Sequence, residues 1–77
     1  MNITVSIRDD CTENIIQIDQ RQELRVGLRI LQQTGKTPYA GEPDFFRSEA
    51  LGQTVSAYCT FQELGIFSGD VLTVIHD

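Results

Sequence analysis

The 77-residue sequence has few of the residues on which catalytic and metal-binding chemistry depends. It contains no tryptophan, two cysteines (Cys11 and Cys59) and a single histidine, His76, next to the last residue. Two thiols cannot supply a four-cysteine zinc or iron–sulfur site, and Cys59 has no histidine near it in sequence to act as its base. A Cys11–Cys59 disulfide is possible by count, but a cytosolic chain keeps its thiols reduced. We therefore expect two unpaired thiols, no cofactor, no metal and no enzymatic activity.

Positive charge and long apolar runs are scarce as well. Six Lys and Arg residues stand against eleven Asp and Glu, which gives a net charge of −5. A general binder of nucleic-acid phosphates carries the opposite surplus. No segment approaches the ~20 apolar residues of a membrane span, and residues 1–7 lack the features of a signal peptide. These absences predict a single cytoplasmic domain over residues 1–77 that neither binds nucleic acid nor inserts into a membrane.

The first nineteen residues predict two strands. Polar and apolar residues alternate over residues 2–7, which places Ile3, Val5 and Ile7 on one face. A polar segment at 8–14 follows, and the alternation resumes at 15–19. Strands this close in sequence are expected to pair antiparallel.

A helix is expected next, over residues 21–34. Asp19 is the expected N-cap and Gly35 the expected C-cap. Gly27 falls near the middle of the apolar arc, where a glycine costs about 1 kcal/mol of helix propensity. We therefore expect Gly27 to allow close approach to a sheet.

The apolar arc of this helix is about 200° wide, more than one sheet face needs. It includes Ile30, and it predicts a partly exposed edge at Leu28 or Val26. Whether this edge leaves a monomer or supports a weak homodimer stays open.

Four further elements are expected after the helix. They are a strand at 44–48, a short edge strand at 53–56, one helical turn opened by the capping box Thr60-Phe-Gln-Glu63, and a last strand at 71–75. One of Phe45 and Phe46 must point inward and the other outward, and the pattern does not say which. The element order predicts an α+β fold of the β-grasp type, with a mixed four- to five-stranded sheet wrapped across one α-helix.

Almost the whole chain resembles ubiquitin-like domains, from the strand with Ile3, Val5 and Ile7 and the helix ending at Gly35 to the C-terminal third, which carries the most specific likeness. The segment Val55-Ser-Ala-Tyr-Cys-Thr-Phe-Gln-Glu-Leu-Gly-Ile66, followed by Ser68-Gly-Asp70 and an apolar strand, resembles the small bacterial ubiquitin-like proteins of the YukD/EsaB family. These proteins accompany type VII secretion systems. The resemblance implies a ubiquitin-like domain that acts as a cytosolic accessory component and docks on a membrane-anchored part of that machine.

Two surfaces are candidates for protein docking. Residues of the last strand, Val71 and Ile75, with Phe46 as the outward phenylalanine, form a predicted apolar patch on the sheet face opposite the helix. Arginines spaced by four predict a basic stripe on the helix; they are Arg21, Arg25 and Arg29. The alternative to each is an ordinary solvated surface.

Two other functions remain open from the sequence. A conjugatable modifier or sulfur carrier needs a slim Gly-Gly tail, whereas the printed chain ends in Ile75-His76-Asp77. That reading therefore requires a longer native chain, and we expect a protein that is not conjugated to targets. A free-standing regulatory adaptor unrelated to secretion is the second alternative.

Overall fold

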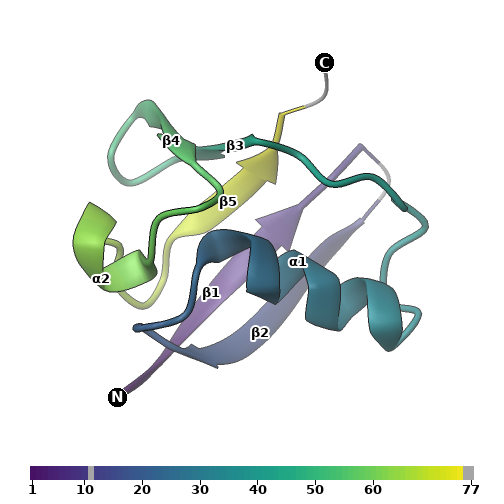
Figure 1. Cartoon of the computed structure of the whole chain (residues 1–77), viewed down its shortest axis with the longest axis horizontal. Coiled ribbons are helices and arrows are strands. Elements are labelled where there is room, and N and C mark those ends of the chain that lie inside the picture. Colours follow the sequence, from purple (N-terminus) through teal and green to yellow (C-terminus); the bar gives the residue numbers. More distant parts are fainter. Residues whose placement is uncertain (11, 76–77) are drawn as a thin grey trace.

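The computed structural model describes residues 1–10 and 12–75, so the expectations for Cys11, His76 and Asp77 lie outside the described residues. Within these ranges the chain forms five strands and two helices (Figure 1). They are β1 (Asn2–Arg8), β2 (Glu13–Asp19), α1 (Leu24–Gln33), β3 (Phe45–Ser48), β4 (Gln53–Ser56), α2 (Phe61–Leu64) and β5 (Val71–Val74). Neither helix is long and apolar enough to cross a membrane within the described part of the chain.

The five strands form one mixed sheet, in the order β2-β1-β5-β3-β4. β1 and β5 pair in parallel at its centre, and the other neighbours pair antiparallel. Helix α1 lies across one face of the sheet, and α2 lies near the end at which β5 begins, where Phe61 N donates to Gln22 O at 3.2 Å just before α1 (Figure 1). This confirms the expected β-grasp arrangement, including β4 as a short edge strand.

The core lies between the sheet and α1, and Gly27 brings the two layers together. A Cβ atom at Gly27 would lie 2.8 Å from Cδ1 of Ile16 and 3.0 Å from Cδ1 of Ile7. Both distances are shorter than ordinary van der Waals contact, so the missing side chain is what lets β1 and β2 pack against the helix backbone. The expected close approach is confirmed.

One expectation about an apolar side chain was wrong. Phe46 is fully buried, whereas Phe45 is 48% exposed, so Phe46 cannot belong to the outward patch. The register explains the choice: Phe46 lies opposite Val74 of β5 and Val55 of β4, both of which point inward.

On the helix, Leu28 is buried and Val26 is half-buried against the core, so the expected partly exposed edge lies at Val26. Ile30, on the same apolar arc, is 41% exposed.

Helix α1 begins at Leu24, later than expected, and Asp19 does not cap it. The first amides of α1 are satisfied by another part of the chain: Leu24 N donates to Cys59 O at 3.1 Å, and Arg25 N donates to Ala57 O at 3.1 Å. The Asp19 carboxylate instead accepts from the backbone N–H of Arg21 at 2.9 Å. Long-range hydrogen bonds therefore set the start of the helix.

Helix α2 forms as its sequence predicts. Thr60 Oγ1 accepts from Glu63 N at 3.0 Å, and Glu63 Oε1 accepts from Thr60 N at 3.0 Å, which completes the capping box. These bonds lower the pKa of Glu63, because they favour its charged form. Gly65 ends the helix with a φ of +73°, a conformation that other residues resist.

Candidate functional site

The first candidate surface is the sheet face that α1 leaves uncovered, called the outer face below. Phe45 and Ile75 lie side by side on it, because Ile75 N donates to Phe45 O at 3.3 Å and extends the β3–β5 pairing by one residue. Phe45 is exposed and Ile75 is half-buried. The two side chains form a small apolar pair at one end of β5.

Charged residues separate this pair from Val71. Arg8 Nε donates to Glu13 Oε1 at 2.8 Å, and Arg8 NH1 donates to Glu49 Oε1 at 2.9 Å. Because β5 lies between β1 and β3, the bond to Glu49 crosses over β5. Arg47 of β3 lies opposite Thr73, which stands between Val71 and Ile75 in sequence.

The structure therefore corrects the predicted patch of Val71, Ile75 and Phe46. Only Ile75 of these residues belongs to an apolar pair, and Phe45 replaces Phe46 in it. Val71 is half-buried beside Glu49, whose N–H donates to Val71 O at 3.0 Å.

The predicted arginine stripe is also shorter than expected. Arg21 precedes α1 and donates through Nε and NH2 to the two carboxylate oxygens of Asp19, at 3.2 and 3.1 Å. These bonds hold the pKa of Asp19 well below its usual range. Arg25 and Arg29 do lie on α1, and both line the same pocket. Arg21 is not among its lining residues.

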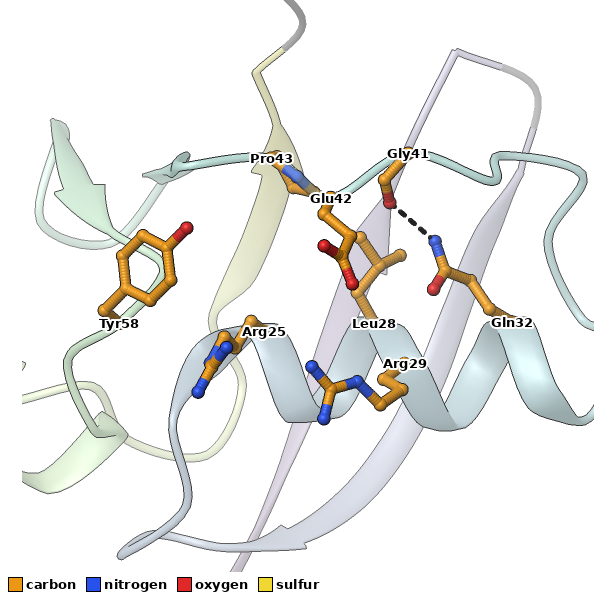
Figure 2. A pocket seen from close by; sticks show the side chains of 8 residues that line it. All are labelled: Arg25, Leu28, Arg29, Gln32, Gly41, Glu42, Pro43 and Tyr58. Atoms are coloured by element: carbon orange, nitrogen blue, oxygen red, sulfur yellow. Dashed lines mark hydrogen bonds between the residues drawn. The ribbon is translucent and has the colours of Figure 1, made fainter.

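That pocket lies between α1 and the chain that leads into β3 (Figure 2). Its helical wall is formed by Arg25, Leu28, Arg29 and Gln32. Gly41, Glu42 and Pro43 form the opposite wall, and Tyr58 closes one end. We call it the Arg25–Tyr58 pocket.

Hydrogen bonds hold the opposite wall in place. Gln32 Nε2 donates to Tyr39 O at 3.1 Å and to Gly41 O at 2.8 Å, the second of which is drawn in Figure 2. The Tyr39 ring lies so close to Gly41 that a Cβ there would be 2.5 Å from Tyr39 Oη. Gln32 therefore ties the loop to α1 at two carbonyl oxygens, and the Tyr39 ring packs within the loop against Gly41.

The end of the pocket at Tyr58 is fixed by charge. Tyr58 Oη donates to Asp44 Oδ1 at 2.8 Å, and this bond raises the pKa of Tyr58 because it favours the neutral phenol. The Arg25 guanidinium lies 5.1 Å from the centre of the Tyr58 ring, within cation–π range. Arg25 Nε also donates to Glu23 Oε1 at 2.6 Å, which raises the pKa of Arg25.

Two charged side chains of the pocket, Arg29 and Glu42, are not held by bonds to the described residues. Arg29 is exposed and forms no ion pair with the residues that the structure describes. Glu42 is exposed too, and Figure 2 shows its carboxylate pointing down toward α1, above Arg29. Neither side chain is held by a hydrogen bond to the described part of the chain.

Cys59 and the acidic residues are the remaining side chains to consider for a catalytic or metal-binding site. The thiol of Cys59 is free and half-buried. The backbone carbonyl of the same residue accepts a hydrogen bond from the N–H of Leu24, at the start of α1. In the β1–β2 hairpin, Asp9 Oδ1 accepts from Thr12 N at 2.8 Å, so it serves the turn. Across residues 1–10 and 12–75, His, Cys, Asp and Glu side chains form no group of three that could hold a metal ion.

Solved structures of other proteins share this fold. The chain superposes on the ubiquitin-like domain of an Arabidopsis thaliana protein with a TM-score of 0.70 and 14% identity, over 96% of this chain and 76% of that one. The fold is that of ubiquitin. No family model matches the sequence, and no curated protein sequence matches it significantly.

Two further ubiquitin-like domains match over nearly their full length. The EccD5 ubiquitin-like domain from Mycobacterium xenopi has a TM-score of 0.64 and 16% identity, and the match covers 100% of this chain and 98% of that one. The ubiquitin-like domain of Plasmodium falciparum Dsk2 has a TM-score of 0.62 and 17% identity, with coverage of 97% and 100%. At these identities the matches show the shared fold.

Sequence reasoning found part of each surface and missed the rest. The spacing of Arg25 and Arg29 predicted that they share a face, and the alternation of β5 predicted that Ile75 points outward. Glu42 and Tyr58 were missed, because only the fold brings residues 42 and 58 to the side of α1. No sequence pattern signals that meeting.

Proposed function

We propose that this protein is a non-enzymatic docking module of a type VII secretion system, in which it binds a membrane-anchored component from the cytoplasmic side. The observation that carries the proposal is the nearly full-length match to the EccD5 domain, which comes from a mycobacterial type VII system. The resemblance of residues 55–70 to the YukD/EsaB proteins supports the same context from the sequence.

The docking surface of the proposal is the outer face around Phe45 and Ile75. A phenylalanine that is 48% exposed at the end of a rigid strand offers apolar area without a large cost in side-chain entropy. Arg47, on the same strand, lies two residues from Phe45 and is exposed. An apolar anchor beside a cation is the composition typical of an interaction surface.

A matched pair of variants tests this surface. Phe45→Ala removes the anchor, whereas Phe67→Ala removes a phenylalanine that is 74% exposed in the turn before β5, away from Ile75. If Phe45 is an anchor of the interface, its truncation costs about 1–2 kcal/mol of binding, or roughly five- to thirtyfold in affinity. Phe67→Ala leaves affinity unchanged.

The experiment is affinity capture from detergent-solubilised cells of the source organism, followed by mass spectrometry. We expect the wild type and Phe67→Ala to recover a membrane-anchored secretion component, and Phe45→Ala to lose it. Recovery of an unrelated partner, with no secretion component, contradicts the secretion role. Equal recovery by both variants contradicts the proposed surface.

A further inference from the structure

We propose that the Arg25–Tyr58 pocket binds an acidic side chain of a partner protein, and that Glu42 is the internal carboxylate that this side chain displaces. The inference rests on the proposed function in one respect, that the domain works by docking to another protein. It adds a second contact, on the opposite side of the sheet from Phe45, and it states the chemistry of the group that enters.

The pocket is lined by two arginines that have unused hydrogen-bond donors. A guanidinium carries five N–H groups. Arg25 uses its Nε in the bond to Glu23, and its terminal nitrogens form no hydrogen bond with the described residues. Arg29 has all five groups available within the same part of the chain. Planar guanidinium donors match the two oxygens of a carboxylate, which makes that group the natural ligand.

The contacts of Arg25 place its donors in advance. Its guanidinium is held between the Glu23 carboxylate and the Tyr58 ring. Tyr58 is itself held by Asp44. A side chain fixed before binding loses less conformational entropy when the ligand arrives. Arg29 is free to close over the ligand from the next turn of the helix.

The size of the pocket favours a carboxylate over a larger group. Its cavity volume is about 30 Å³, far below the ~150 Å³ of a cavity that binds benzene. Buried Leu28 forms an apolar lining on the helix side, and Pro43 is buried opposite. The methylene groups of an incoming Glu would contact these two residues while its carboxylate reaches the arginines.

Glu42 places a negative charge beside the arginines without forming an ion pair with either of them. Its carboxylate points toward α1 (Figure 2), and its negative charge contributes to the raised pKa of Arg25. It nevertheless forms no ion pair with the described residues. A carboxylate that is attracted to the arginines but not bonded to them can be displaced at low cost, and it repels an acidic ligand until it moves.

The test uses a defined probe, the capped pentapeptide acetyl-Ala-Ala-Glu-Ala-Ala-amide, and its Gln counterpart. Each is titrated into the labelled full-length protein, and NMR follows the Nε–H signals of Arg25 and Arg29 and the amide of Gly41. We expect saturable shifts with the Glu peptide that weaken with salt, and none with the Gln peptide.

Variants then separate the pocket from general charge. Arg29→Gln abolishes saturation, whereas Arg21→Gln, which removes an exposed arginine that does not line the pocket, leaves it intact. Glu42→Gln strengthens binding by about fivefold, the upper range for an exposed pair of charges. Glu49→Gln removes the same charge from the outer face and is the matched control, for which we expect no change. Amide spectra of the variants check that each is folded.

Three results would overturn the inference: no saturable shift in wild type or Glu42→Gln, equal shifts with the Gln peptide, or equal losses in Arg29→Gln and Arg21→Gln. These outcomes concern the pocket alone, because the peptide titration requires no secretion component. If capture through Phe45 succeeds while the peptide fails to bind, the pocket inference is wrong and the proposed function stands.

Discussion

Replacing Asp70 tests why the turn before β5 has the sequence Ser68-Gly-Asp70. Asp70 is only 5% exposed, and its carboxylate ties three elements together. Oδ1 accepts from Ala50 N at 2.9 Å and from Val71 N at 2.7 Å, and Oδ2 accepts from the hydroxyl of the fully buried Ser48. This residue therefore holds the β3–β4 turn against the start of β5.

Asp70→Ala removes both acceptor oxygens and with them all three hydrogen bonds. A hydrogen bond to a charged group contributes about 1.5–3 kcal/mol, and a buried donor left unpaired costs about 1–3 kcal/mol. The N–H of exposed Ala50 can regain water, whereas the Ser48 hydroxyl and the Val71 N–H are less accessible. We expect a loss of about 3–5 kcal/mol, which is a large part of the roughly 4–12 kcal/mol available to a domain of this size.

Asp70→Asn is the matched control, because it preserves shape. Its Oδ1 can accept from both amides, and its Nδ2 can donate to Ser48 Oγ, which has a lone pair beyond the one used by Leu51 N. We expect a loss of about 1 kcal/mol, the difference between charged and neutral bonds. Urea denaturation followed by circular dichroism measures both variants. Equal losses of unfolding free energy in the two variants, or a loss below about 1 kcal/mol for Asp70→Ala, would refute the role assigned to the Asp70 carboxylate.

Three further predictions concern the fold and the pocket. Phe46→Ala should lower the free energy of unfolding by about 3–5 kcal/mol and Phe45→Ala by less than about 1 kcal/mol; similar losses in urea denaturation would contradict the inward position of Phe46. Thr60→Ala should lower the free energy of unfolding by about 1 kcal/mol in the same assay, because the helix cap is lost. An unchanged value would show that the capping box does not stabilise the fold. The Tyr58 phenol should ionise above its ordinary pKa, and Asp44→Asn should return it toward that value in an alkaline absorbance titration. Because the folded state favours the neutral phenol, this bond stabilises the fold below pH ~10 and loses its effect as pH rises above that.

Local sequence signals predicted most of the secondary structure. The alternation in β1, β2 and β5, the capping box of α2 and the central Gly27 each reflect a rule that acts over a few residues, and each was confirmed. The order of elements was then sufficient to predict the β-grasp arrangement, because few sheets can wrap across a single helix in that order.

The errors arose where contacts distant in sequence decide the outcome. The start of α1 was misplaced because carbonyls at Ala57 and Cys59 take its first amides. The outward phenylalanine could not be chosen until the register of β3 with β5 was known. The proposed patch was too large for the same reason, since the Arg8–Glu49 bond joins residues 41 positions apart. These errors concern surfaces, so the candidate sites were predicted less well than the fold.

The central claim is that the outer face around Phe45 and Ile75 docks the domain on a type VII secretion component. The most direct measurement replaces Phe45 with a photoreactive phenylalanine analogue in cells of the source organism and identifies the cross-linked protein by mass spectrometry. The same analogue at Phe67, which is more exposed but lies away from Ile75, is the control. We predict a cross-link from position 45 to a membrane-anchored component of the secretion system and none from position 67. A partner outside that system, or a cross-link from position 67 with none from position 45, would contradict the account.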